Sequence, residues 1–178
     1  MIMKAQDKIH IGSLIRDRLK EDGRTTSWLA QRIQCKRRNI HDIFYRSSID
    51  TALLYRICVA VKNNFFTHFF KICEIQINKT GCIASKVCYN ELEEELNIGK
   101  LIKNKLVEEG RSAIWLSQKI NCQRNNIYCI FNRSSIDTEQ LLSICLALNT
   151  NFFEYYCEYY EKYVCKIMIQ NGQLYDAI

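Results

Sequence analysis

Residues 28–44 read WLAQRIQCKRRNIHDIF, and this stretch decides the fold that we predict for the chain. Its apolar residues recur three and four positions apart on both sides of residues 34–36, which is the spacing of two amphipathic helices joined by a tight turn. Three consecutive cations, Lys36, Arg37 and Arg38, open the second helix. The apolar residues that we assign to the buried faces of the two helices are Trp28, Leu29, Ile33, Ile40, Ile43 and Phe44.

The same pattern returns 87 positions later, where residues 115–131 read WLSQKINCQRNNIYCIF. The second copy, residues 98–153, aligns without a gap with residues 11–66, and 31 of the 56 aligned positions are identical. Self-similarity at this level indicates an internal duplication. We therefore expect two domains, at residues 8–71 and 95–169, and a linker at residues 72–94.

Each copy shows the pattern of five short helices, so the predicted class is all-α. Gly23 ends the first helix, because glycine just past a last turn adopts the left-handed conformation with ease. Ser47 and Ser48 are capping candidates for the fourth helix, with Asp50 in its first turn. An aromatic fifth helix follows. It is expected to be longer in the second copy, because tyrosines recur there at helical spacing. Between the copies, residues 73–87 are expected to form a loop or a small hairpin, and the acidic run 91–96 to begin the next helix.

Ten cysteines would indicate disulfides in a secreted chain, but the N-terminus has no apolar core of a signal peptide. We expect reduced thiols that pack as small apolar residues, since Cys35 and Cys58 match Cys122 and Cys145 across the repeat. No C-x2-C pair with metal-ligand spacing is present, so we predict neither a metal site nor a cofactor.

The charge of the chain is concentrated in the repeats. The chain carries a net charge of +6 at pH 7, and residues 11–66 hold 11 basic and 5 acidic residues against 7 and 4 in residues 98–153. No run of about 18 apolar residues could span a membrane, so we expect a soluble, cytoplasmic protein. Basic residues gathered at one turn are typical of proteins that bind nucleic acid.

Each copy resembles the helix-turn-helix DNA-binding domain of the lambda-repressor/Cro/Xre family, through residues 25–51 in the first copy and 112–138 in the second. The likeness includes the buried Ala30, which is Ser117 in the second copy, and the Ser-Ile-Asp-Thr run that leads into the fourth helix. The resemblance implies two tandem five-helix domains, each of which places its third helix in the major groove of double-stranded DNA. One departure is that Gln34 and Asn121 stand where the family often has glycine at the end of its second helix.

The resemblance also implies two sets of contact residues. The residues that would face base edges are Arg37, Arg38 and His41 in the first copy and Arg124, Asn125 and Tyr128 in the second. The residues that would contact phosphate are Thr25, Thr26, Lys36, Arg46, Ser112, Gln123 and Arg133. Arginine can bridge two acceptors of guanine, and asparagine can pair with adenine.

From the duplication we predict a sequence-specific DNA-binding protein, a transcriptional regulator of bacterial or phage type that reads a bipartite site. Covalent linkage would supply the second head without a partner, giving a monomeric pseudo-dimer in which the aromatic fifth helices pack on each other. A homodimer of the whole chain is the alternative state.

Three other functions have weaker support. A protein-interaction module or structural helical scaffold is the main rival, because fold alone does not establish function. An enzyme is disfavoured by the lack of a phosphate loop, a nucleophile with its base, or paired carboxylates. RNA binding is disfavoured by the lack of a sheet with exposed aromatics. Trp28 and Trp115 are expected to be core anchors rather than base-stacking residues.

Overall fold

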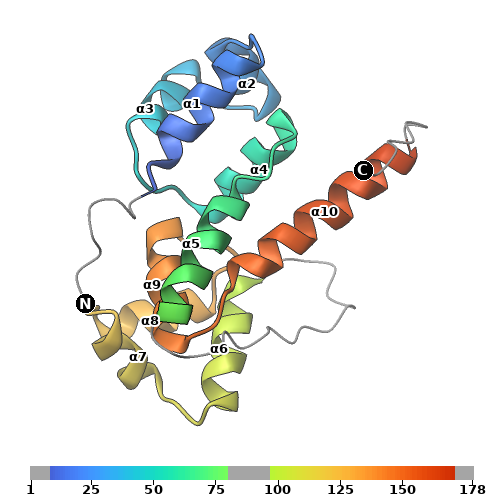
Figure 1. Ribbon diagram of the computed structural model, residues 1–178. Helices are drawn as coiled ribbons and strands as arrows, with labels where there is room; N and C mark the ends of the chain where they lie inside the picture. The colour runs from blue at the N-terminus through green and yellow to red at the C-terminus, as the bar shows by residue number, and fades with distance from the viewer. Residues whose placement is uncertain (1–8, 80–96, 171–178) are drawn as a thin grey trace.

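A computed structural model describes residues 9–79 and 97–170 of the chain (Figure 1). Within these residues it contains ten α-helices and no extended strand, which confirms the all-α class. The helices are α1 (Ile11–Glu21), α2 (Thr26–Arg32), α3 (Arg37–Phe44), α4 (Thr51–Val61), α5 (Phe66–Lys79), α6 (Ile98–Glu108), α7 (Ala113–Lys119), α8 (Arg124–Phe131), α9 (Thr138–Leu148) and α10 (Phe153–Gln170).

The helices fall into two corresponding sets of five. Each of α1 to α5 begins 87 residues before its counterpart among α6 to α10, and the first four pairs are equal in length. Only the last pair differs, because α10 has 18 residues and α5 has 14. The prediction of a longer fifth helix in the second copy is confirmed. None of the described helices is long and apolar enough to cross a membrane.

A glycine lets α1 lie directly on the end of α3. A Cβ atom added at Gly12 would stand 2.2 Å from the carbonyl oxygen of Ile43, and the Gly12 N–H donates to the carbonyl of Arg46 at 3.0 Å. In the second copy, Gly99 meets the carbonyl oxygen of Ile130 at the same distance. A contact between backbones this close admits only glycine, which explains why both copies have it.

The turn between α2 and α3 is closed by a residue in the left-handed conformation. Gln34 has φ 53° and Asn121, its counterpart, has φ 52°. The N–H of the following residue, Cys35, donates to the carbonyl of Ala30 at 2.9 Å. The departure from glycine therefore leaves the left-handed turn in place, at a conformational cost that asparagine bears more easily than glutamine.

We expect Gln34→Gly to raise the free energy of unfolding by about 0.5–1 kcal/mol. The left-handed conformation costs a residue with a side chain about 1–2 kcal/mol, and glycine avoids this cost. Glycine also has greater freedom in the unfolded chain, which cancels part of the gain in stability. Urea denaturation of the two proteins measures the difference. Asn121→Gly is the matched control, with a smaller expected gain, and a loss of stability in Gln34→Gly would contradict the explanation.

The expected caps of α4 are wrong. Asp50, and not Ser47 or Ser48, is the N-cap, and its carboxylate accepts the N–H groups of Ala52 and Leu53 at 2.9 and 3.3 Å. Both serines lie too early in the chain to reach these donors, since α4 begins only at Thr51. In α9 the cap is likewise Asp137.

The expectation of a loop or hairpin at residues 73–87 is wrong for its first seven residues. Helix α5 continues to Lys79, past the boundary that we set at residue 71. The cause is a helical apolar face, because Phe69, Cys73 and Ile77 recur every four residues and all are buried. Residues 80–96, which include the acidic run 91–96, lie outside the described residues.

The two copies meet first through their backbones. The N–H of Thr51 donates to the carbonyl of Ile136, and the N–H of Thr138 donates to the carbonyl of Ile49, both at 2.9 Å. These bonds flank an isolated antiparallel bridge between Asp50 and its own counterpart, Asp137. Replacing the donor and the acceptor of one bond by their counterparts in the other copy gives the second bond. The two copies are therefore related at this point by an approximate two-fold axis.

The fifth helices form the second contact between the copies. Phe66 stacks on Tyr156 with ring centroids 4.6 Å apart, and Phe69 stacks on Phe153 at 5.0 Å. These two pairs are also counterparts of each other. The Tyr156 hydroxyl donates to the hydroxyl oxygen of Thr51 at 2.8 Å, beside the backbone bridge. The prediction that the fifth helices pack on each other is confirmed.

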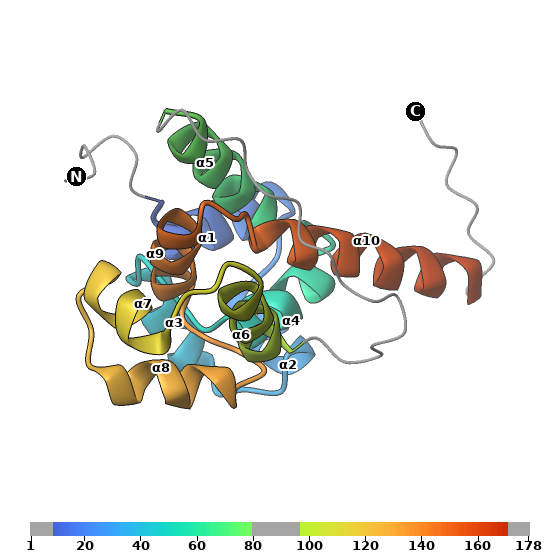
Figure 2. The same ribbon diagram turned by 90° about the horizontal axis from the view of Figure 1, so that it is seen from below.

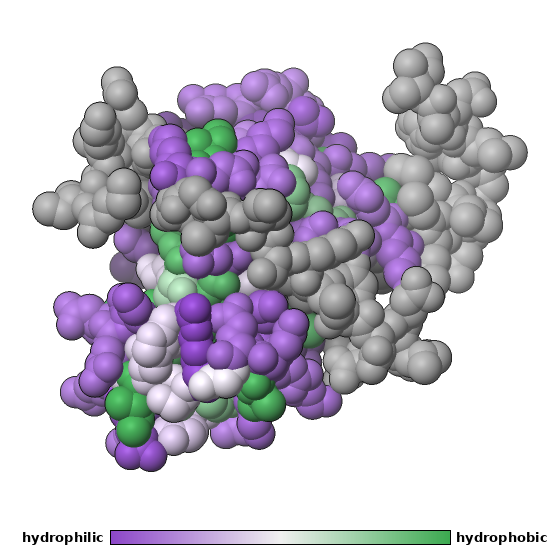
Figure 3. All heavy atoms as spheres, turned by 60° about the horizontal axis from the view of Figure 1, so that its bottom comes forward, coloured by the Kyte–Doolittle hydropathy of each residue, from purple (hydrophilic) through white to green (hydrophobic). Residues whose placement is uncertain are grey.

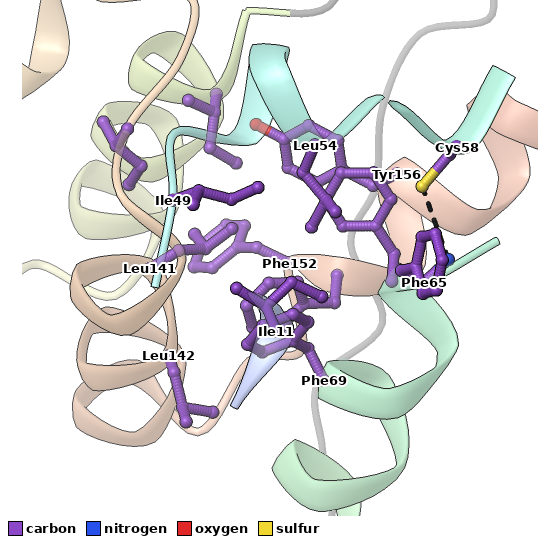
Figure 4. Packing of buried hydrophobic residues seen from close by; sticks show 14 of the residues in the cluster. Ile11, Ile49, Leu54, Cys58, Phe65, Phe69, Leu141, Leu142, Phe152 and Tyr156 are labelled. Atoms are coloured by element: carbon purple, nitrogen blue, oxygen red, sulfur yellow. Dashed lines mark hydrogen bonds between the residues drawn. The ribbon is translucent and has the colours of Figure 1, made fainter. Parts of the chain in front are cut away.

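The core is continuous across the junction of the copies (Figure 4). Ile49 and Leu54 of the first copy lie beside Leu141 and Phe152 of the second, and all four are buried. Buried apolar area is the main stabilising contribution in folding. The relative position of the two copies is therefore held by a packed interior as well as by hydrogen bonds.

Candidate functional site

The cationic start of α3 lies on the surface. Arg37, Arg38 and His41 are exposed, whereas Ile40 and Ile43 on the opposite face of the helix are buried. The predicted division of this helix into an outer polar face and an inner apolar face is confirmed. Lys36 is the N-cap by position, but its side chain makes no capping bond.

The corresponding face of α8 is also exposed, but its side chains contact each other. The Arg124 guanidinium donates to the Tyr128 hydroxyl from Nη2 at 3.0 Å and lies 5.3 Å from the centre of the tyrosine ring. The Asn125 side chain lies beside them and is exposed. Residues four apart on a helix are neighbours, so the Arg-x3-Tyr spacing could have predicted this pair. The contact holds the Arg124 guanidinium over the outer face of α8.

The cations at these helix starts are available for an external partner. Among residues 9–79 and 97–170, no carboxylate lies within 4.0 Å of Lys36, Arg37, Arg38 or Arg124. Arginines on α1 differ, since Arg18 forms an ion pair with Asp22 at 3.1 Å. An unpaired surface cation attracts anionic ligands more strongly than one that a carboxylate neutralises.

The predicted phosphate contacts lie at the starts of α2 and α7 and on both sides of α3 and α8. The hydroxyls of Thr25 and Ser112 accept the N–H groups of Trp28 and Trp115, each at 3.1 Å, and so cap α2 and α7. Each hydroxyl can still donate its own hydrogen to an acceptor outside the protein. Of the seven predicted residues, only Thr26 is half-buried, and the other six are exposed.

An arginine covers the outer face of each tryptophan. The guanidinium carbon of Arg24 lies 4.2 Å from the Trp28 ring centre, and that of Arg111 lies 4.1 Å from the Trp115 ring centre. Both rings are half-buried and pack against the core, so their prediction as core anchors holds with part of each ring at the surface. Sequence reasoning missed the cation–π pairs, although both copies keep the Arg-x3-Trp spacing.

Both candidate helices lie on one side of the molecule. Figure 1 shows α3 near the top of the molecule and α8 near its bottom, and in Figures 1 and 2 both helices lie toward the left of the picture. The bridge between Asp50 and Asp137 joins the segments that follow the two helices, since each of these residues comes six positions after the end of its helix. One extended partner could therefore contact both helices.

The turn thiols pack as small apolar groups. Burial raises the pKa of the Cys35 thiol, against the opposing effect of Arg56, and burial also raises the pKa of the Cys122 thiol. Neither thiol is thereby activated as a thiolate nucleophile. Over the described residues, no group of three or more histidine, cysteine or acidic side chains is placed to hold a metal ion.

The chemistry that these faces offer is hydrogen-bond donation and positive charge. Arginine and asparagine side chains on α3 and α8, and Lys36 at the N-cap of α3, can donate to oxygen and nitrogen acceptors. Tyr128 adds an aromatic ring, and this residue is 43% exposed. Comparison of the chain with protein-family models, with curated proteins and with solved structures found no match.

Proposed function

We propose that this protein binds double-stranded DNA in a sequence-specific manner as a transcriptional regulator, through two covalently linked helix-turn-helix heads. The observation that best supports the proposal is the pair of α3 and α8. Each begins with an exposed arginine that has no carboxylate within 4.0 Å in the described part of the chain. The two helices lie on the same side of a junction with an approximate two-fold axis.

In this proposal the third helix of each head lies in the major groove. Arg37 and Arg38 donate to guanine, and Asn125 pairs with adenine. The Arg124 guanidinium, held by Tyr128, approaches a base edge from the second head. One good bidentate contact discriminates between bases by about 1–3 kcal/mol. Lys36 and Arg46 contact phosphate and fix the register of the first head on the duplex.

The proposed active form is a single chain. In dimeric helix-turn-helix proteins, the two recognition helices contact successive major grooves about 34 Å apart on one face of the duplex. Here the backbone bridge and the stacked aromatic rings of α5 and α10 would take the place of the contact between two subunits. Light scattering at micromolar concentration separates the states, since a homodimer has twice the mass of 21.1 kDa.

Because the two heads differ, the proposed target is not a palindrome. The outer face of α3 offers Arg38 and His41 where that of α8 offers Asn125 and Tyr128. Arginine favours guanine and asparagine favours adenine, so the two half-sites should differ in base composition. The first head also supplies more charge for phosphate.

Selection of bound duplexes from a random-sequence DNA pool tests this proposal. We expect two unequal half-sites at a fixed spacing. A single half-site would mean that only one head reads DNA. Absence of any enriched motif would contradict sequence-specific binding.

We expect Lys36→Ala to flatten the dependence of DNA affinity on salt. Each phosphate contact on duplex DNA releases about one counterion, so its loss should lower the slope of log K against log salt by about one unit. Titration of a fluorescent duplex at several salt concentrations measures this slope. Lys71→Ala is the control, because Lys71 is an exposed cation of α5 and lies outside α3, α8 and the residues that flank them. An unchanged slope in Lys36→Ala would remove Lys36 from the phosphate contacts.

A protein-interaction surface is the second candidate function, and the second copy supports it. Val107, Ile114 and Tyr128 are 73%, 44% and 43% exposed. Figure 3 shows hydrophobic residues separated by polar ones on the face of the molecule that is turned forward there. Scattered apolar residues of this kind are common on protein surfaces, so the candidate ranks below DNA binding.

A further inference from the structure

A hollow with a polar rim lies beside the outer face of α3. It has a volume of about 290 Å³ and lies where the last turn of α1, the start of α2 and the end of α3 come together. Leu19 and Phe44, which are buried, form its apolar lining. The other residues that line it are Arg16, Lys20, Arg24, Thr26, His41 and the exposed Tyr45.

The cations of this hollow are incompletely neutralised. Arg16 Nε is 3.7 Å from the Asp17 carboxylate, beyond hydrogen-bond distance, and this buried nitrogen has no hydrogen-bond partner among the described residues. Lys20 has no carboxylate within 4.0 Å in the same part of the chain. Asp22 is 3.8 Å from Arg24 Nε but lies closer to Arg18, at 3.1 Å. The hollow is therefore positively charged.

The Arg24 side chain is already fixed in position at this hollow. Its guanidinium lies over the Trp28 ring, and its Nη1 donates to the carbonyl of Ala60 at 3.4 Å. A side chain that is ordered in the free protein loses little conformational entropy on binding. The guanidinium still has donors that are not used by these contacts, because arginine has five N–H groups.

We propose that this hollow binds a phosphate group. Arg16 and Arg24 would donate to its oxygens, Lys20 would supply a third charge, and the Thr26 hydroxyl would donate one further bond. Guanidinium groups suit phosphate oxygens because they can form two parallel hydrogen bonds. The inference rests on the proposed function, and it adds a phosphate contact made by α1, outside α3 and its flanking residues.

The second copy lacks this site, and it therefore provides an internal control. The residues there that correspond to Lys20, Thr26 and His41 are Val107, Ala113 and Tyr128. The exchange removes one full charge and one hydroxyl, while Lys103 and Arg111 keep the charges of Arg16 and Arg24. The side chains of the exposed Val107 and the half-buried Ala113 can make no hydrogen bond to phosphate. The first head alone should anchor phosphate in this way.

Titration of the whole chain with inorganic phosphate tests the site without DNA. We expect saturable shifts of the backbone amide NMR signals of residues 16–26, and no comparable shifts at residues 103–113. Lys20→Val, which copies the second head, should weaken this binding at least about fivefold. The double change Val107→Lys with Ala113→Thr should create binding at residues 103–113. All the altered side chains are exposed or half-buried, and urea denaturation verifies that each variant is folded.

The same variants tested on duplex DNA identify the source of the phosphate. A lower salt slope in Lys20→Val, together with the lost phosphate shifts, supports the site with a DNA backbone phosphate as ligand. If the phosphate shifts depend on Lys20 but DNA binding does not, the site is supported with free phosphate as its ligand. If the shifts depend on Lys20 and the chain does not bind DNA at all, the site is likewise supported, but the proposed function is wrong. Phosphate shifts that are spread over the surface or unchanged in Lys20→Val overturn the site, even if DNA binding persists.

Discussion

Replacing Arg37 and Arg38 together by alanine is expected to weaken binding of the selected DNA duplex at least about 30-fold. Each bidentate contact to guanine contributes about 1–3 kcal/mol, and 1.4 kcal/mol corresponds to a factor of ten in affinity. The loss should be largest for the guanine-containing half-site. Fluorescence anisotropy with the selected duplex, and with a duplex of scrambled sequence, measures both the affinity and the specificity ratio.

Two comparisons make this result specific to α3. The fold should be unaffected, because both side chains are exposed and have no carboxylate within 4.0 Å in the described ranges. The Lys71→Ala variant should bind as the unaltered chain does. If the double variant lost affinity equally for the selected and the scrambled duplex, the two arginines would contact phosphate and not bases. If it lost none, the placement of α3 in the groove would be wrong.

Gly12→Ala is expected to lower the free energy of unfolding by about 3 kcal/mol or more. Overpacking usually costs about 1–3 kcal/mol, and this position lies at the upper end because the atoms that a new Cβ would meet belong to backbone. The added carbon would stand 2.2 Å from the Ile43 carbonyl oxygen and 2.7 Å from that of Phe44. The helix α1 would have to move away from α3, which also breaks the bond from the Gly12 N–H to Arg46. Urea denaturation followed by circular dichroism measures the change.

Gly23→Ala is the control for the introduced methyl group. Nothing lies within 4 Å of a Cβ at Gly23, so only its positive φ of 62° is unfavourable. That conformation should cost about 1–2 kcal/mol, clearly less than the clash at Gly12. Gly99→Ala should match Gly12→Ala, because it meets the Ile130 carbonyl at the same distance. Equal effects at Gly12 and Gly23 would show that the close contact of α1 with α3 does not determine the cost.

The features that could be predicted from the sequence are those with a local pattern. Helical periodicity identified the buried Ile40 and Ile43, and with them the exposed face of α3. The exact repeat then identified α8 and its face. The caps of α2 and α7 have such a pattern too, because a hydroxyl residue, Thr25 or Ser112, precedes the apolar pattern in both copies.

The features that escaped prediction depend on contacts between distant residues. The backbone pairing of Asp50 with Asp137 joins residues that are 87 positions apart, and it leaves no periodic signal in the sequence. The extension of α5 is an exception with a local pattern: the prediction for residues 73–87 is a loop or hairpin, although Cys73 and Ile77 continue the spacing of Phe69. The hollow beside α3 was missed because its cations, on α1 and the loop that follows, enclose a hollow only when α1 packs on α3.

The backbone bridge has a consequence for the history of the chain. Its two sides have the same sequence, Ile-Asp-Thr, at residues 49–51 in the first copy and at residues 136–138 in the second. A contact of this kind is isologous, which is the form of interface in a symmetric homodimer. A smaller ancestor with one set of five helices could have paired with itself through these residues before two genes were fused. After fusion the interface no longer depended on subunit concentration, and the two heads were free to evolve apart.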